Sequence, residues 1–147
     1  MPGIICAIRG GPASRPTIEK AIQVALETKL PIYFLYIINL DFLSHTSSSR
    51  THVISKEMSE MGEFILLTAQ SEAEAQGISA EGVIRNGQIV DEIIHLCQEV
   101  KADYVILGQP KNQKDENVFT QERLSAFSLH IEEESNAKVI LAERMTN

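Results

Sequence analysis

The fold is decided near the start of the chain by the segment IICAIRGGPAS, residues 4–14. It opens with a continuous apolar run from Ile4 to Ile8, which predicts a buried β-strand. A turn at Gly10-Gly11 follows, and Ser14 is placed to cap a helix. Apolar residues then recur at helical spacing from Ile18 to Ala25. The segment therefore predicts a strand, a turn and a helix in succession.

The same alternation continues to the end of the chain. Further strands are predicted for Ile32–Ile38, Ser79–Ile84, Tyr104–Leu107 and Lys138–Ala142. Helical apolar stripes lie between them, at Met58 to Ala69 with the helix reaching about Gln76, at Val90 to Cys97, and at Leu124 to Ile131. Gly77 is expected as the residue that ends the long helix. The predicted order of elements is β-α-β-α-β-α-β-α-β.

Four of the five strands are nearly continuous apolar runs, as burial on both faces of a parallel sheet requires. Right-handed crossovers then favour a doubly wound, five-stranded parallel α/β sheet of order 3-2-1-4-5 with helices on both faces. Such sheets bind ligands beyond the carboxyl ends of the strands where the order reverses, here between the first and fourth strands. Two segments are expected there, Arg9 to Ser14 and Gly108 to Lys114.

The composition is that of one globular domain, residues 1–147. The chain has 20 Asp and Glu against 13 Lys and Arg, a net charge of −7, and its basic residues are scattered. This balance argues against nucleic acid as a partner. No signal peptide is seen, and no apolar stretch approaches the roughly 20 residues that span a bilayer. Cys6 and Cys97 lie in apolar runs and are expected to be buried thiols, so the sequence predicts a cytoplasmic protein without membrane association.

No catalytic or metal-binding set is apparent. The four histidines, His45, His52, His95 and His130, have no partners at metal-ligand spacing. His45 and His52 lie in a polar tract, Ser44 to His52. This tract belongs to a connection from Asn39 to Val53 that is expected to be a mobile surface loop. No pairing of Ser or Cys with His and Asp can be argued.

Four segments resemble the universal stress protein family over essentially the whole chain. They are residues 4–14, Val83–Gly87, Ala102–Gly108 and Ala137–Leu141. The third is the most telling, because the family typically shows a small residue and Asp before an apolar strand that ends in Gly. The resemblance implies the same doubly wound fold. The family has two groups of members, one that binds ATP or another adenine nucleotide and one that does not.

The chain departs from the nucleotide-binding members at two places. They usually carry Asp after the first strand, where it contacts the adenosine portion, and this chain has Arg9. Their phosphate loop reads G-x-x-G, nine residues, then G-[S/T]. Here Gly108 is kept, Lys111 replaces the second glycine, and the final pair is Gln121-Glu122 or Ser125-Ala126, depending on the register. The resemblance therefore implies the fold more strongly than it implies bound ATP or AMP.

The candidate binding residues share one place, the carboxyl ends of the central strands. They are Ile8, Arg9, Gly10 and Ser14, then Ile38, and then Leu107, Gly108, Lys111 and Ser125. Two alternatives stay open for Arg9: it binds an anion, or it pairs with Asp115, Glu116 or Glu122 and closes the cleft. Gly10-Gly11 either cradles an anion or forms a tight turn that needs positive φ.

The leading hypothesis is a stress-associated regulatory module that acts by binding, without standard ATP binding and with an unidentified protein partner. The alternatives are an adenine-nucleotide binder with an unusual phosphate loop, and an enzyme acting on a phosphorylated small molecule through Arg9. A homodimer is expected through the last strand, Lys138 to Ala142, because an open apolar edge seeks a partner and the resembled family pairs there. The alternative is that the tail, Glu143 to Asn147, shields this edge.

Overall fold

The computed structural model describes residues 2–9, 14–39, 48–108 and 121–142. The described strands are β1 (Ile4–Ala7), β2 (Ile32–Ile38), β3 (Ala80–Asn86), β4 (Tyr104–Leu107) and β5 (Lys138–Leu141). The described helices are α1 (Arg15–Thr28), α2 (Ser48–Glu74), α3 (Ile89–Val100) and α4 (Gln121–Ser135). Strands and helices alternate along the chain, as the sequence predicts.

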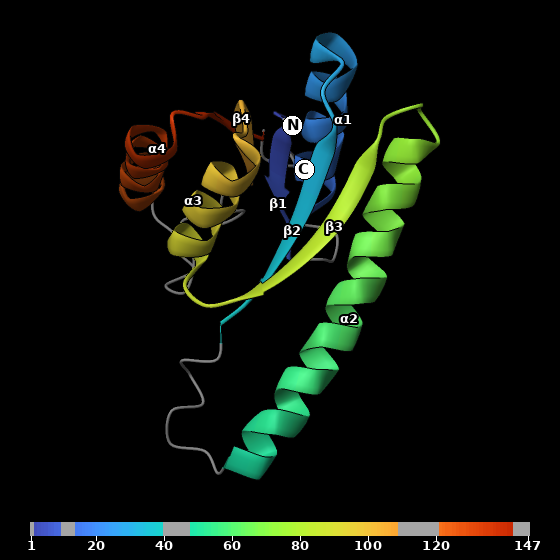
Figure 1. The fold of residues 1–147 in the computed structure, drawn as a ribbon, viewed down its shortest axis with the longest axis vertical. Helices are drawn as coiled ribbons and strands as arrows, with labels where there is room; N and C mark the ends of the chain where they lie inside the picture. Colours follow the sequence, from blue (N-terminus) through green and yellow to red (C-terminus); the bar gives the residue numbers. More distant parts are fainter. Residues whose placement is uncertain (1, 10–13, 40–47, 109–120, 143–147) are drawn as a thin grey trace.

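The five strands form one parallel sheet of order β3-β2-β1-β4-β5, which confirms the predicted topology (Figure 1). β1 lies at the centre, where Ile4 pairs with Ile32 of β2 on one side and with Tyr104 of β4 on the other. The chain builds outward from β1 to β3 and then crosses to β4. The strand order therefore reverses between β1 and β4.

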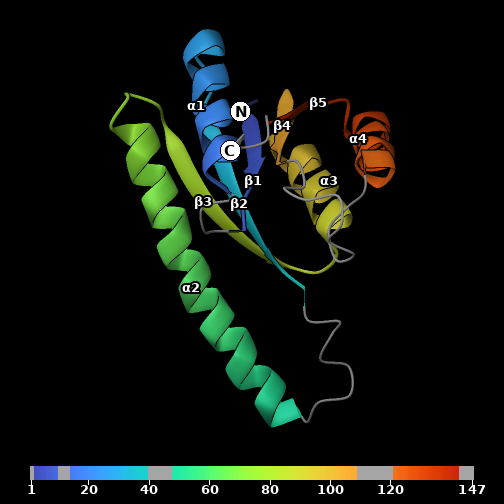
Figure 2. The same ribbon diagram turned by 180° about the vertical axis from the view of Figure 1, so that it is seen from behind.

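Two helices cover each face of the sheet (Figures 1 and 2). Ile4 and Cys6 point to the face covered by α1 and α2, where they pack with Ala21 and Leu66. Ile5 points to the other face and packs in a second cluster with residues of α3 and α4. Successive residues of β1 thus enter different cores, which is why its sequence is a continuous apolar run.

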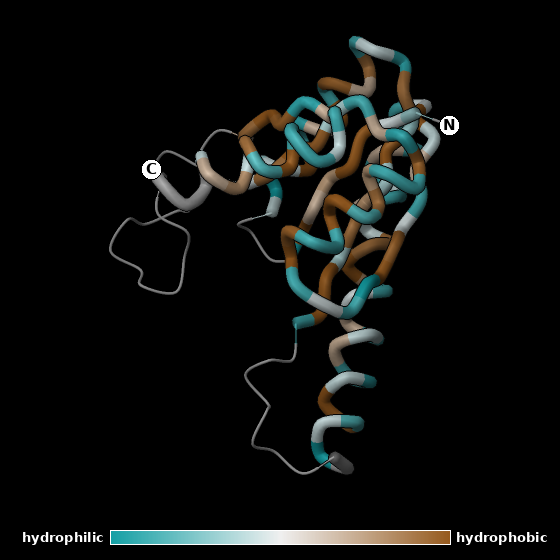
Figure 3. The backbone as a smooth tube through the Cα atoms, turned by 60° about the vertical axis from the view of Figure 1, so that its left-hand side comes forward, coloured by the Kyte–Doolittle hydropathy of each residue, from teal (hydrophilic) through white to brown (hydrophobic). Residues whose placement is uncertain are grey.

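The long helix α2 corrects part of the prediction of a surface loop from Asn39 to Val53. The helix begins at Ser48, so residues 48–53 are helical, and residues 40–47 lie outside the described part of the chain. No proline or glycine interrupts the sequence from Ser48 onward until Gly62, and half-buried Ile54 extends the apolar stripe toward the helix start. Figure 3 shows this first part of α2 extending beyond the rest of the fold.

Three strands have boundaries that differ slightly from the predicted ones, and β3 begins at Ala80, one residue later than predicted. β1 ends at Ala7 and β5 at Leu141, one residue early in each case, although Ile8 and Ala142 still donate backbone hydrogen bonds to the adjacent strands, at 2.9 and 2.8 Å. β3 runs to Asn86, which pairs with Ile38. At the end of α2, Gly77 adopts φ +81, as predicted for a helix-ending glycine. Within the described residues, no helix has the length and apolar character needed to cross a bilayer.

Candidate functional site

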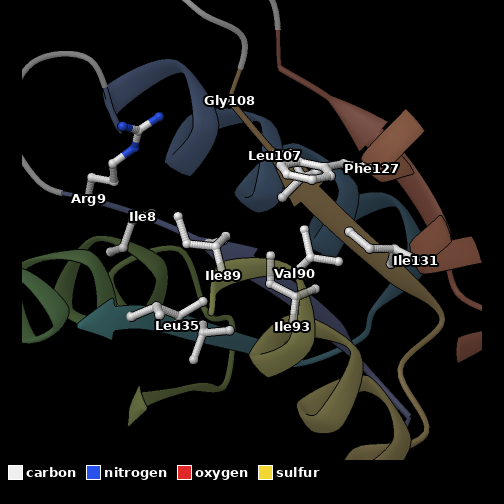
Figure 4. A pocket seen from close by; sticks show the side chains of 12 residues that line it. Ile8, Arg9, Leu35, Ile89, Val90, Ile93, Leu107, Gly108, Phe127 and Ile131 are labelled. Carbon is white, nitrogen blue, oxygen red and sulfur yellow. The ribbon is translucent and has the colours of Figure 1, made fainter. Parts of the chain in front are cut away.

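A cavity of about 110 Å³ opens where the strand order reverses, on the face covered by α3 and α4 (Figure 4). Its lining residues come from the ends of β1, β2 and β4 and from both helices. They are Ala7, Ile8, Arg9, Leu35, Ile37, Ile89, Val90, Ile93, Leu107, Gly108, Phe127 and Ile131. The cavity lies where doubly wound sheets bind their ligands, as the sequence predicts.

Arg9 is the one ionisable side chain among these described lining residues. It is exposed, and Figure 4 shows its guanidinium apart from the apolar side chains, on the side where Gly108 ends β4. No described acidic residue forms an ion pair with it. Of the acids considered as partners, Asp115 and Glu116 lie outside the described residues, and of Glu122 in α4 only the backbone is described. The site therefore combines an apolar interior with a cation at its rim.

Ser14 links the start of α1 to the residues that follow β1. The Arg9 backbone N–H donates to Ser14 Oγ at 3.2 Å, and Ser14 is buried. The hydroxyl makes no capping hydrogen bond to α1, although Ser14 occupies the N-cap position. The predicted capping by the side chain is therefore wrong, because the hydroxyl accepts a hydrogen bond from the Arg9 backbone instead. Ser14 positions the backbone at Arg9 and lines no part of the cavity.

Gly108 is required by a close contact with α1. A Cβ atom at Gly108 would lie 2.6 Å from Thr17 Oγ1. Thr17 is buried, and its branched side chain has little freedom to move away. Glycine at this position is thus explained by helix packing, independently of any phosphate.

The structure brings together four of the predicted site residues and places three others, Ser14, Ile38 and Ser125, outside the cavity lining. Ile8, Arg9, Leu107 and Gly108 line the cavity. Ile38 belongs to the core on the opposite face, and its neighbour Ile37 lines the cavity instead. Ser125 is exposed and is not a lining residue. Gly10 and Lys111 lie outside the described residues.

The apolar walls of the site were not assigned to it from the sequence. These walls are formed by Ile89, Val90 and Ile93 of α3 and by Phe127 and Ile131 of α4. The two helices are joined by a hydrogen bond from Gln98 Nε2 to the Glu134 carbonyl oxygen at 3.0 Å. In α3, apolar residues stand in adjacent pairs from Ile89 to Cys97, so its apolar face is wider than core packing alone needs. This width is the signal in the sequence that could have indicated a cavity wall.

The thiols and imidazoles of the described residues lie away from the cavity. Burial raises the pKa of the Cys6 thiol far above its usual range, and burial raises that of Cys97 to about 11 despite a hydrogen bond with Ser135. Both thiols are therefore neutral, as predicted for buried cysteines. His95 is exposed on α3, with Nδ1 3.7 Å from Glu92 Oε2. No group of three metal-ligating side chains occurs in the described part of the chain.

The outer edge of β5 carries a side-chain hydrogen bond. Lys138 donates its backbone N–H to the Asp103 carbonyl oxygen and Ala142 donates to Leu107, so these groups face the sheet. Because successive N–H groups of a strand point to opposite sides, the Val139 N–H points away from β4. It donates a hydrogen bond to Glu132 Oε2 of α4 at 3.0 Å. Glu132 thus satisfies one outward donor of the strand predicted to form the dimer.

A family model described as "Universal stress protein family" matches residues 2–119. Universal stress protein MJ0531 of Methanocaldococcus jannaschii is 24% identical over 106 residues, which cover 71% of this chain and 62% of that relative. The match thus spans less than two thirds of the relative's length.

Solved structures share the fold. Universal stress protein UspA from Lactobacillus plantarum superposes with a TM-score of 0.75 at 14% identity, covering 97% of each chain. A universal stress protein family protein from Arabidopsis thaliana with AMP bound has a TM-score of 0.62 at 16% identity, covering 99% of this chain and 94% of that one. At these identities the likeness concerns the fold.

Proposed function

This chain belongs to the universal stress protein family, and from that premise we propose that it is a stress-associated binding module that works without the family's usual ATP site. It acts by binding a ligand or a partner and performs no chemistry of its own. The single sheet that contains both β1 and β5 supports one domain over residues 1–147.

Arg9 carries this proposal. It stands at the rim of the cavity, two residues after the end of β1. The family resemblance implies an aspartate at this place in the nucleotide-binding members, where it contacts the adenosine portion. A guanidinium donates hydrogen bonds and accepts none, so it cannot replace a carboxylate as an acceptor for adenosine hydroxyl groups. The substitution removes one acceptor and reverses the charge at the same point.

An adenine nucleoside monophosphate is the second candidate ligand. The similar Arabidopsis structure has AMP bound, and one cation at the rim matches one phosphate group better than it matches three. In this case Arg9 would contact the phosphate instead of the adenosine portion. The module would then respond to AMP or a related nucleotide.

Binding of nucleotides separates the two candidates. The protein is first assayed for co-purified nucleotide by its absorbance near 260 nm, which is sensitive because the chain has no Trp and only three Tyr. It is then titrated calorimetrically with AMP. No bound nucleotide and no heat support the leading proposal, whereas micromolar binding of AMP that Arg9→Asp abolishes supports the second candidate.

The same titration on Arg9→Asp with Mg-ATP asks how much of the family's site survives. Binding by Arg9→Asp alone would mean that one reversed charge closes the cleft to ATP. No binding by either protein would mean that the changes after Gly108 are sufficient to prevent it. Both results agree with the proposal, and they differ in which residues account for it.

We also propose a homodimer that pairs through residues Lys138 to Ala142, that is, through β5 and the residue that follows it. An edge strand presents unpaired backbone groups that a second copy can satisfy. The hydrogen bond from Val139 to Glu132 competes with such pairing, so the carboxylate must move aside when the dimer forms.

A further inference from the structure

We infer that the cavity beside Arg9 binds a small organic anion, with an apolar body of about six heavy atoms inside the cavity and one carboxylate or phosphate group at the Arg9 guanidinium. The inference rests on the proposed function, because it assumes that ATP does not occupy the cleft. It specifies the chemical class of the ligand that does.

The charge of the site sets the charge of the ligand. Arg9 is the one ionisable group among the described lining residues, and no described acid neutralises it. A ligand with one anionic group balances this single cation. A guanidinium presents paired donors that match the two oxygens of a carboxylate or two oxygens of a phosphate.

The walls set the polarity of the rest of the ligand. Val90 and Ile93 of α3 face Phe127 and Ile131 of α4 across the interior (Figure 4). No polar side chain other than Arg9 belongs to the described lining, so a hydroxyl or amino group placed there would lose its hydrogen bonds to water. The interior therefore favours a hydrocarbon or an aromatic ring.

The volume sets the size of that apolar part. A cavity of about 150 Å³ lined by apolar side chains binds benzene in another protein, and the present cavity of about 110 Å³ is smaller and open at its rim. It matches a single small ring or a short branched chain. Adenine has about ten heavy atoms against about six in benzene, so adenosine requires the walls to move apart.

The orientation follows from where the cation lies. Figure 4 shows the Arg9 guanidinium at the upper left of the site, apart from the apolar side chains of α3 and α4. A bound ligand therefore points its ring toward α3 and α4 and its anionic group toward the ends of β1 and β4. The apolar ring of the ligand then lies against the apolar walls, and its anionic group lies at the Arg9 guanidinium.

Four probes test the inference by ligand-detected NMR or calorimetry on the full chain. Phenylacetate and phenyl phosphate carry the same ring with the two kinds of anionic group, and they distinguish a carboxylate ligand from a phosphate ligand. The alcohol 2-phenylethanol keeps the ring without the charge, and AMP supplies a larger anion. We expect one of the two aromatic anions to bind at least tenfold more tightly than the alcohol.

Three variants locate the binding. Arg9→Gln keeps a polar side chain but removes the charge, and it should weaken binding of the anion about tenfold, equal to ~1.4 kcal/mol. Val90→Phe fills the interior and should abolish binding while Arg9 stays in place. Arg85→Gln is the matched control: it removes an arginine whose guanidinium contacts Glu99 at 2.6 Å outside the cavity, and it should bind like the unmodified protein.

The outcomes distinguish this inference from the proposed function. If neither aromatic anion binds and Mg-ATP does not bind either, the inference is overturned while the proposed function stands. If Mg-ATP binds in the micromolar range, the proposed function is wrong, and the inference fails with it because ATP then occupies the cleft. If the alcohol binds as tightly as the anions, or if Arg9→Gln and Arg85→Gln bind alike, the cavity holds no anion and the inference is wrong.

Discussion

Gly108 stands where β4 ends, and its missing side chain leaves room for Thr17 of α1. The family resemblance implies a phosphate loop that would begin at this glycine. The structure gives a packing reason for glycine here, because a Cβ atom at this position would lie 2.6 Å from Thr17 Oγ1. We therefore expect Gly108→Ala to lower the free energy of unfolding by about 1–3 kcal/mol through overpacking. Urea denaturation followed by circular dichroism measures the change.

A double-variant cycle tests the named contact. Thr17→Ala removes the Oγ1 atom, so Gly108→Ala should cost less in that background, with a coupling of about 0.5–3 kcal/mol. Thr17→Val keeps an atom of similar size at the same place and should give no relief. Equal costs of Gly108→Ala in all three backgrounds would show that the contact does not explain the glycine.

Cys6 and Cys97 are buried thiols whose pKa values are raised by burial, that of Cys97 to about 11. A raised pKa keeps the neutral thiol at pH 8, and the neutral thiol is a poor nucleophile. Both should therefore react with a disulfide reagent at least about 100-fold more slowly in the folded protein than in urea. Fast reaction of one thiol at pH 8 without denaturant would contradict its burial.

At the scale of single elements, α2 shows one face to the sheet and the opposite face to solvent. Leu66 is 4% exposed and packs in the core, while Phe64, two residues earlier, is 72% exposed. Leu66→Ala should destabilise the protein by about 2–5 kcal/mol, and Phe64→Ala by less than about 0.5 kcal/mol. Thermal denaturation of the two variants compares them directly, and equal destabilisation would mean that Phe64 is covered in solution.

The sequence predicted the elements well where one apolar pattern decided them. The runs of β1 and β2 enter two cores at once, so their character was unambiguous. The start of α2 was missed because residues Ser48 to His52 are polar and carry no apolar stripe of their own. Their helical conformation depends on continuation from Ile54 and the residues beyond it.

The candidate site was predicted only in part. The rule that ligands bind where the strand order reverses located Arg9 and Gly108, because this rule depends only on strand order. It could not identify Val90, Ile93 or Phe127, since apolar residues on a helix look alike in sequence whether they fill a core or line a cavity. Which of them faces the cavity depends on how α3 and α4 pack on the sheet.

At the scale of the whole molecule, the edge strand β5 decides whether two copies assemble. If they pair through β5, the protein should elute with twice the 16.3 kDa mass of one chain in size-exclusion chromatography with light scattering. Val139→Pro removes the outward N–H and keeps the bonds of Lys138 and Ala142 to the sheet, so it should give a monomer. Its circular dichroism spectrum serves as the control for folding.

Glu132→Ala tests whether the Glu132 carboxylate competes with a second copy for the Val139 N–H. It frees the Val139 N–H for a second copy, so the dimer should dissociate at lower concentration than that of the unmodified protein. A monomer at every concentration for both the unmodified chain and Glu132→Ala would contradict pairing through β5. A dimer that Val139→Pro leaves intact would place the interface elsewhere.

The most direct test of the central claim is a calorimetric titration of the unmodified protein with Mg-ATP. Because Arg9 stands at the rim of the cavity where the family resemblance implies an aspartate that accepts hydrogen bonds from adenosine, we predict no measurable heat of binding at millimolar nucleotide. Saturable binding in the micromolar range would contradict the claim, because it would show that the cleft holds ATP with an arginine in that place.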